Sequence, residues 1–360
     1  MFLILVINPG STSTKLAIFE DEKELFSESI IHQPTDLERF SSTLEQLEYR
    51  TNLTEKFIAY SRYNLEDFSA MVGRGGVLPP MPGGTYLVNE RMVDDLKYRT
   101  QADHPSNLGG LIVYNLSFKV NKDGKPMPLV VDPVSVDEFD LVAYVTGLPE
   151  IKRRCLSHSL NMKAVVRKVC KDLSIPYEDS RFVVVHLGSG ISVSPMVGGR
   201  IIDVNNANEG GPFSCDRAGA LPTVSLVSLC FSGAYTHDEL IQRLTLRGGL
   251  YAHLGTKDLR EVEQRVEGGD GKAKLVYDAM VYQIAKEIGA MATVLHGQLD
   301  GIVLTGGMSF SSHLVEEIKK RVSFLGGVYV YPGEEEMRAL VLGALRVLRG
   351  EEKAKVYRGV

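Results

Sequence analysis

Two turns rich in glycine and serine carry the residue types that bind phosphate groups. The first is the segment Asn8 to Lys15 (NPGSTSTK), and the second is His186 to Gly190 (HLGSG). Backbone N–H groups in such turns can surround phosphate oxygens, and hydroxyl groups and a lysine add further donors. Neither is a Walker A loop, which needs GxxxxGK[ST] before a helix. A lone turn of this kind is more often an ordinary hairpin, but the pair favours a polyphosphate site.

Two arginines, an aspartate and a histidine stand where they could bind an oxyanion. Arg74 is flanked by glycines (VGRGG), and Arg217 lies in the segment PFSCDRAG. A guanidinium binds carboxylate and phosphate oxygens through parallel hydrogen bonds. Asp132 ends an apolar run, and His158 precedes an amphipathic segment. A carboxylate at the end of a strand commonly faces the ligand crevice of an α/β fold.

Each of these residues also has a purely structural interpretation. Arg74 could be an exposed loop residue, and Arg217 could pair with its neighbour Asp216. Asp132 could cap a turn. His158 could lie near the N-cap of the helix that follows it. The residue types alone leave these alternatives open.

Two further segments lie in the C-terminal third of the chain. The run Leu304 to Ser309 (LTGGMS) follows an apolar segment, and its glycines Gly306 and Gly307 would allow close approach of a flat or phosphate-bearing ligand. A plain strand-to-helix connection is the alternative. The acidic run 334–336 opens the last helical segment, where carboxylates favour the helix dipole. By itself that run indicates helix capping more than metal binding.

The elements that must position these turns repeat half a chain apart. Apolar strands are expected over residues 2–7, 16–19 and 25–31, and again over 182–185, 191–196 and 200–204. Placing Gly10 over Gly188 puts Asn8 over His186 and Ser11 over Ser189. The repeat predicts two structurally related domains.

Helical periodicity follows each set of strands. Apolar residues fall on one helical face over 162–173, 276–291 and 337–348, and these segments alternate with strands over 129–132, 301–305 and 328–331. The pattern predicts an α/β fold. We expect one domain to contain residues 1–150 plus about 338–360, and the other to contain residues 151–337, with the last helix returning to the first domain.

Composition limits the class of protein. The chain has 360 residues, 44% hydrophobic content, a net charge of −5 and four cysteines without a CxxC pair. We therefore expect no nucleic-acid partner, no membrane partner and no disulfide framework. Its apolar N-terminal run is too short for a signal sequence, which favours a cytoplasmic location.

Taken together and in order, these motifs resemble the acetokinase family of the sugar kinase/Hsp70/actin superfamily. Within that family the loop Gly73 to Tyr86 (GRGGVLPPMPGGTY) resembles the butyrate kinase branch, because acetate kinases carry HRVVHGG there. The run Tyr331 to Met337 (YPGEEEM) is similar to that branch as well. The chain departs from acetate kinases at Ser189, where they show asparagine. The resemblance implies two domains of the actin-like ATPase (ribonuclease H-like) type with a central cleft, the second of which binds the nucleotide.

The resemblance also implies roles for individual residues. Catalytic roles in binding the acid and the transferred phosphoryl group are implied for Arg74, Asp132, His158 and Arg217. Contacts with ATP or ADP are implied for Asn8, Ser11, Ser13, Lys15, His186, Gly188, Ser189, Gly190, Asp258, Arg260, Gly306 and Gly307. Roles at Mg²⁺ are implied for Glu335, Asp132 and Asn8, although Glu334 or Glu336 could take the place of Glu335.

The implied activity is reversible transfer of the ATP γ-phosphoryl group to the carboxylate of butyrate or a related short-chain or branched fatty acid. Gly75 and Gly76 would leave room for the longer acyl chain. One alternative is an acetate or propionate kinase. Another is an actin- or Hsp70-like ATP-binding protein without kinase activity. A homo-oligomer is expected by analogy with the family.

Overall fold

The computed structural model describes residues 1–120, 123–124 and 126–359 and divides into two compact units. Unit 1 contains Met1–Asp137 and Glu335–Val360, and unit 2 contains Glu138–Glu334. The division falls earlier than the expected boundary at residue 150. Phe139 and Ala143 pack in the same apolar cluster as Met162, and the N–H of Asp140 donates to the carbonyl of Ile202. The segment after Asp137 therefore belongs to the core of unit 2.

Unit 1 is built on one mixed β-sheet. In the described part of the chain the sheet has seven strands in the order β12-β5-β6-β4-β1-β2-β3. The strands are β1 (Leu3–Pro9), β2 (Ser13–Glu20), β3 (Lys23–Ile31), β4 (Ala70–Arg74), β5 (Thr85–Leu87), β6 (Met127–Val131) and β12 (Lys355–Val356). The helices are α1 (Pro34–Leu37), α2 (Leu47–Tyr60), α3 (Glu90–Tyr98), α4 (Asn107–Val120) and α12 (Glu336–Leu348).

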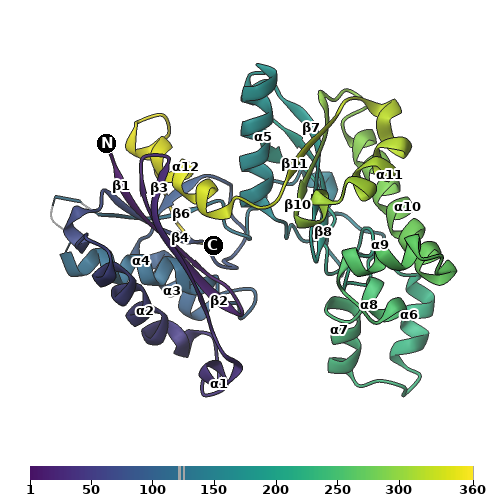
Figure 1. Ribbon diagram of the computed structural model, residues 1–360, viewed down its shortest axis with the longest axis horizontal. Helices are drawn as coiled ribbons and strands as arrows, with labels where there is room; N and C mark the ends of the chain where they lie inside the picture. Colours follow the sequence, from purple (N-terminus) through teal and green to yellow (C-terminus); the bar gives the residue numbers. More distant parts are fainter. Residues whose placement is uncertain (121–122, 125, 360) are drawn as a thin grey trace. The chain divides into compact units, whose positions relative to one another are not determined.

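Helices cover both faces of this sheet (Figure 1). Successive strand residues point to opposite faces, and Leu5 and Ile7 of β1 pack in the cluster that includes Phe57 of α2 and Leu108 of α4. The helix α12 packs on β1, β4 and β6. The last helix thus returns to the sheet formed by the N-terminal strands, which explains why β1 and β4 are buried on both faces.

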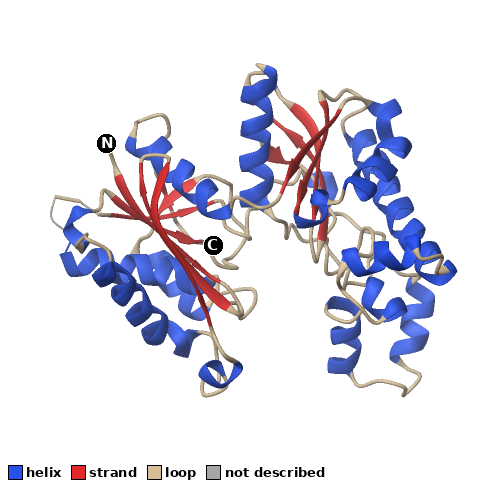
Figure 2. Cartoon of the chain, in the orientation of Figure 1, coloured by secondary structure: helices blue, strands red, loops and turns tan. Residues whose placement is uncertain are grey.

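Unit 2 has a smaller sheet and more helices. In the described residues its sheet has five strands in the order β11-β10-β7-β8-β9. The strands are β7 (Arg181–Leu187), β8 (Ile191–Val197), β9 (Arg200–Ile201), β10 (Gly301–Gly306) and β11 (Val328–Pro332). The helices are α5 (Ser159–Leu173), α6 (Thr223–Cys230), α7 (His237–Thr245), α8 (Gly249–Leu254), α9 (Leu259–Glu267), α10 (Gly271–Val294) and α11 (Ser312–Val322). Figure 2 shows these helices around the strands of unit 2.

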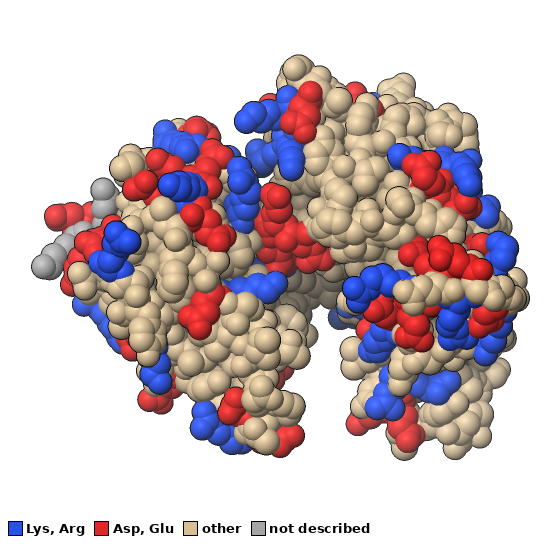
Figure 3. Space-filling model, in the orientation of Figure 1, with Lys and Arg blue, Asp and Glu red and all other residues tan. Residues whose placement is uncertain are grey.

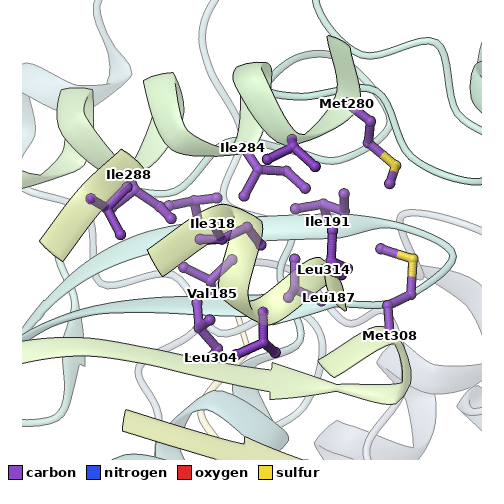
Figure 4. Close-up of a cluster of buried hydrophobic side chains, with 14 of the residues drawn as sticks. Val185, Leu187, Ile191, Met280, Ile284, Ile288, Leu304, Met308, Leu314 and Ile318 are labelled. Carbon is purple, nitrogen blue, oxygen red and sulfur yellow. The ribbon is translucent and has the colours of Figure 1, made fainter. Parts of the chain in front are cut away.

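The two faces of this sheet bury different sets of side chains. Val185 and Leu187 of β7 pack with Ile284 of α10 and Ile318 of α11, as Figure 4 shows. Their neighbour Val184 points the other way, into the cluster formed with α5. Such alternation along a fully apolar strand is the pattern of a sheet covered on both sides.

The repeat predicted from the sequence is present in the two sheets. In unit 1, β1 pairs antiparallel with β2 and parallel with β4, and β4 pairs parallel with β6. In unit 2, β7 pairs antiparallel with β8 and parallel with β10, and β10 pairs parallel with β11. Asn8 and His186 are each the last residue but one of the first strand. The two phosphate-loop candidates therefore occupy the same topological place.

The surface is charged with both signs. Lys and Arg side chains are interspersed with Asp and Glu on the face of each unit drawn in Figure 3, in keeping with the small net charge of −5. Among the described residues, no helix combines the length and the apolar character needed to cross a membrane.

Close contact between α12 and β6 predicts a sensitive glycine. A Cβ atom on Gly343 would lie 2.5 and 2.6 Å from the two γ-methyl groups of Val131. Because a valine in a strand has little rotamer freedom, we expect Gly343→Ala to lower the free energy of unfolding by about 1–2 kcal/mol. Gly289→Ala in α10 is the matched control, since in the described part of the chain nothing lies within 4 Å of its Cβ position.

Urea denaturation of both variants measures the difference. The control should be neutral or more stable by up to about 1 kcal/mol, because alanine favours a helix over glycine. Equal stability changes in the two variants would contradict the packing of α12 described here.

Candidate active site

The first phosphate-loop candidate is the turn between β1 and β2. The N–H of Gly10 donates to the carbonyl of Ser13 at 2.7 Å, and the N–H of His32 donates to the carbonyl of Thr12 at 2.9 Å. Both carbonyls are therefore satisfied within the protein. The turn borders a cavity of about 220 Å³. Its lining consists of Asn8, Pro9, Gly10, Ser11, Thr12, Ser13, Lys15, Arg74, His104, Ser106, Val134 and Glu336.

Arg74 brings a buried guanidinium to this cavity. It is the last residue of β4, which lies beside β1 in the sheet. Its side chain is buried, and its Nη2 lies 3.2 Å from Oε1 of Glu336. Its Nη1 has no hydrogen-bond partner among the described residues. A buried donor without an acceptor costs free energy, so the site is arranged to receive an oxyanion. The exposed-loop alternative for Arg74 is wrong.

The structure distinguishes the three glutamates of the acidic run. Glu336 lines the cavity and accepts a 2.8 Å hydrogen bond from Nδ2 of Asn8, besides its contact with Arg74. Glu335 is exposed and lies 3.9 Å from Nε of Arg338. In unit 2, Oε1 of Glu334 lies 2.9 Å from Nε2 of His186. Only Glu336 shares the cavity with the first phosphate-loop candidate.

A hard cation would find suitable ligands in this cavity. Mg²⁺ is bound through one or two carboxylates together with water and phosphate oxygens, and Glu336 and Asn8 present a carboxylate and an amide side by side. The described residues contain no group of three or more His, Cys, Asp or Glu side chains that could hold a metal alone. The donor set thus fits Mg²⁺ that reaches the protein with a phosphate.

His104 and Ser106 also line the cavity, and the sequence analysis missed both. Nδ1 of His104 and Oγ of Ser106 form a 2.8 Å hydrogen bond just before α4. Burial and the nearby Arg74 guanidinium lower the pKa of His104, which favours the neutral imidazole. The polar run His104-Pro105-Ser106-Asn107 ahead of an apolar helix was the available signal.

Asp132 is held by backbone groups. Its Oδ1 accepts a 2.7 Å hydrogen bond from the N–H of Gly84, and its own N–H donates to the Gly84 carbonyl. Its φ of 38° lies in the left-handed region, which is uncommon for residues other than glycine and is found at sites under functional constraint. The structure therefore shows a turn-stabilising contact for this carboxylate, and its catalytic role stays a prediction.

Gly75 and Gly76 do not open space for an acyl chain. A Cβ atom on Gly75 would lie 2.5 Å from Cβ of Pro133, and one on Gly76 would lie 2.4 Å from Oδ1 of Asn107. The volume that a side chain would fill is already occupied by protein. The prediction that these glycines enlarge the acid pocket is wrong, because their small size serves close packing of the loop.

The second phosphate-loop candidate joins β7 and β8 and lies beside two stacked histidines. The imidazole rings of His158 and His186 have centroids 3.8 Å apart and planes 8° apart. Nδ1 of His186 bonds to Oδ1 of Asn161 at 3.0 Å, and Nδ1 of His158 bonds to Oγ of Ser192 at 3.1 Å. His158 occupies the N-cap position of α5, but its side chain makes no capping hydrogen bond.

Arg217 lies against the same turn. A Cβ atom on Gly190 would come within 2.4 Å of its Nη1, so only glycine lets the guanidinium approach so closely. Burial lowers the pKa of Arg217, and its Nε has no hydrogen-bond partner among the described residues. Asp216 instead pairs with Lys257 at 3.1 Å. The structural alternative for Arg217, a pair with Asp216, is wrong.

The remaining predicted nucleotide contacts are dispersed over unit 2. Asp258 caps α9 and pairs with Arg260 on the surface at 2.7 Å. Gly306 ends β10 with a φ of 90°, and its missing side chain allows contact with the backbone of Leu187. No described atom lies within 4 Å of the Cβ position of Gly307. Of these four, Gly306 therefore touches the strand that leads into the second phosphate-loop candidate.

Comparison with known proteins agrees with the family resemblance of the sequence motifs. The acetokinase family profile matches residues 149–344. The chain is 51% identical to "Probable butyrate kinase" of Thermotoga petrophila, over 100% of this chain and 99% of the relative. It is 46% identical to butyrate kinase 2 of Clostridium acetobutylicum, over 99% of each.

Solved structures of low sequence identity share the fold. The acetate kinase of Porphyromonas gingivalis has a TM-score of 0.77 at 18% identity and covers 97% of this chain and 100% of its own. A propionate kinase from Francisella tularensis has a TM-score of 0.72 at 18% identity, covering 95% and 99%. The predicted α/β fold with two related domains is thereby confirmed. From its motifs, its two sheets and its full-length relatives, the chain belongs to the acetokinase family.

Proposed function

We propose that this protein transfers the γ-phosphoryl group of ATP reversibly to the carboxylate of butyrate or a related short-chain or branched fatty acid. The products are an acyl phosphate and ADP. The observation that carries the proposal is the buried Arg74 guanidinium, which presents an unpartnered nitrogen at a small cavity lined by the first phosphate-loop candidate. Family membership and the names of the full-length relatives support the carboxylate as acceptor and butyrate as the acid.

The chemistry explains why such cations are needed. A carboxylate attacks without losing a proton, so a general base is unnecessary. The difficulty is that the carboxylate and the γ-phosphate are both anions, and charge stays on three equatorial phosphoryl oxygens during transfer. Preorganised donors reduce that repulsion. In this proposal Arg74 and Arg217 neutralise carboxylate and phosphoryl oxygens, and His158 donates to an equatorial oxygen.

The hydrogen bond to Ser192 supports the role of His158. If the Ser192 hydroxyl donates to Nδ1, the ring proton stays on Nε2, which is then a donor. A neutral His158 that donates from Nε2 is the tautomer that this role requires, and the contact with Ser192 permits it.

Mg²⁺ would be held by Glu336 and Asn8 in the cavity of unit 1, with Asp132 two residues before the cavity-lining Val134. The bound cation supplies positive charge to the phosphate oxygens. Glu336 also orients Arg74, because the same carboxylate contacts the guanidinium and the amide of Asn8. In this role we assign Glu336 in place of Glu335.

The nucleotide roles extend the proposal to unit 2. Gly188, Ser189 and Gly190 would bind phosphate oxygens through their backbone N–H groups, as Ser11, Ser13 and Lys15 would in unit 1. The open space at Gly307 and the turn at Gly306 would receive the adenosine. Asp258 and Arg260 would lie near it. The cytoplasmic location also stays a prediction.

Assay of acyl phosphate as its hydroxamate, with ATP, Mg²⁺ and a panel of acids, tests the function. We expect kcat/KM to be higher for butyrate and isobutyrate than for acetate and propionate, by about tenfold or more for each methylene group, because each is worth about 1–3 kcal/mol in an apolar pocket. Highest kcat/KM with acetate or propionate would make the protein an acetate or propionate kinase. ATP hydrolysis without acyl phosphate would indicate a conformational ATPase.

Replacement of neighbouring glutamates tests the metal and positioning role. We expect Glu336→Gln to lower turnover about 10–100-fold, because it weakens the contacts with Arg74, Asn8 and the cation. Glu335→Gln removes the same charge one residue away and should keep near-normal turnover, since that side chain is exposed. A larger loss of turnover in the Glu335 variant would assign the metal and positioning role to Glu335 instead.

We also propose that the protein is a homo-oligomer and that α6 contributes to the contact. Val224 and Phe231 on and beside this helix are 81% and 88% exposed. The segment 218–236 carries no Asp, Glu, Lys or Arg. Its surface therefore suits contact with the same segment of a second copy better than contact with a charged partner. Its exposure would be unfavourable in a monomer.

Light scattering coupled to size-exclusion chromatography tests the assembly. We expect the wild type to form an oligomer and Val224→Glu/Phe231→Glu to shift it toward the monomer. Phe324→Glu is the control, because Phe324 is 81% exposed elsewhere in unit 2. A monomeric wild type, or equal dissociation in the control, would contradict the proposal.

A further inference from the structure

We infer that Arg50, a residue outside the cavity, provides a buried positive charge that strengthens phosphate binding at the first phosphate-loop candidate. Arg50 acts through the turn and its field, as a positioning residue. The inference rests on the proposed function, since it assumes that the cavity receives a phosphate group.

The Arg50 side chain is buried completely behind the turn. It lies in the first turn of α2 with 0% of its surface exposed. Its guanidinium donates to Oε1 of Gln46 at 2.9 and 3.0 Å and to Oγ1 of Thr14 at 2.8 Å. Its Nη1 also lies 3.4 Å from the carbonyl oxygen of Ser13. Among the described residues, every one of these acceptors is neutral, and no carboxylate forms an ion pair with Arg50.

A second titratable group in the same network is kept neutral. Oγ1 of Thr14 accepts from Arg50, so its hydroxyl proton is available for Nε2 of His32 at 2.9 Å. Nδ1 of His32 then donates to Oη of Tyr49 at 3.1 Å. Burial and the charge of Arg50 lower the pKa of His32, whereas Asp36 opposes that shift. The network therefore carries one positive charge, on Arg50.

This charge acts on the cavity in two ways. The Ser13 carbonyl that faces Arg50 also accepts from the N–H of Gly10, which closes the turn. The guanidinium thus stabilises the turn through its contacts with Ser13 and Thr14. In addition, Arg50 and Arg74 both lower the pKa of the cavity residue His104, with Asp103 acting in the opposite direction. The field of Arg50 therefore reaches a side chain that lines the cavity.

An uncompensated buried cation is unfavourable in the absence of an anion. Desolvation lowers the pKa of Arg50 to about 10, because burial disfavours the charged form. A phosphate group in the cavity would supply the missing negative charge in a region of low dielectric, where attraction between charges is strong. A neutral side chain could form hydrogen bonds that stabilise the turn. The positive charge of Arg50 therefore favours a role in anion binding.

The decisive variant is Gln46→Glu. The new carboxylate can still accept both hydrogen bonds from Arg50, so the turn stays supported. Its negative charge offsets the positive charge of Arg50 and removes the field at the cavity. We expect binding of inorganic phosphate, followed by NMR titration without nucleotide or metal, to weaken about tenfold. The pKa of His104 should rise, and the urea midpoint should stay the same or increase.

Gln298→Glu is the matched control. Gln298 also accepts from an arginine, Arg181 at 2.9 Å, and the substitution changes the net charge equally, but at an exposed position in unit 2. Its phosphate affinity and its His104 pKa should equal those of the wild type. Arg50→Met is the second charge-removing variant, and it should weaken phosphate binding to a similar degree.

Two results would overturn the inference. One is wild-type phosphate affinity in Gln46→Glu with the fold intact. The other is an equal loss in Gln298→Glu, which would assign the effect to net charge alone. Failure of the proposed function is a separate outcome, because it would appear as absence of acyl phosphate in the wild-type hydroxamate assay.

Discussion

Repulsion between two anions is the constraint on which the site of this protein depends. A carboxylate and a triphosphate must approach each other, and water is too mobile a solvent to hold that charge in place during transfer. The protein buries guanidinium groups, and some of their N–H donors have no hydrogen-bond acceptor among the described residues. In the part of the chain that the structure describes, Arg74 and Arg217 both have such a donor, and no carboxylate forms an ion pair with Arg50. A bound anion would supply acceptors and negative charge for these cations.

The duplicated topology explains how so few elements position these groups. In each sheet the first strand ends in a glycine-rich turn and lies between an antiparallel and a parallel neighbour. The residue before the end of that strand is Asn8 in one unit and His186 in the other, and each lies at hydrogen-bond or ion-pair distance from a glutamate of the same acidic run. The same backbone arrangement therefore presents two different side-chain chemistries.

Sequence reasoning performed best where a signal is periodic and local. The strands around both turns and the helices over 162–173, 276–291 and 337–348 follow from apolar spacing and are present in the structure. The expected return of the last helix to the first domain is present as well. It performed worst where several equivalent residues are adjacent. Nothing in the spacing of 334–336 separates Glu336 from Glu335, because the choice depends on how the first turn of α12 meets β1 and β4.

Two other differences between the sequence predictions and the structure also arise from contacts between distant parts of the chain. Gly75 and Gly76 looked like open space, yet Pro133 and Asn107 fill the volume that side chains would occupy. The polar run that contains His104 gave only a weak signal, and the packing of the segment before α4 brings this residue to the cavity. In both cases the neighbours are distant in sequence, so composition and periodicity carry no information about them.

The sequence by itself determined the class of fold, the two phosphate-loop candidates and the family, because each is encoded in local patterns or in ordered motifs. Only the tertiary structure decided which glutamate lies beside Asn8, and, among the described residues, which arginine nitrogens lack partners and that the buried Arg50 forms no ion pair with a carboxylate. Those properties depend on burial and on contacts between residues far apart in the chain. Electrostatic effects are set by such surroundings, since the same guanidinium behaves differently in water and in the interior of a protein.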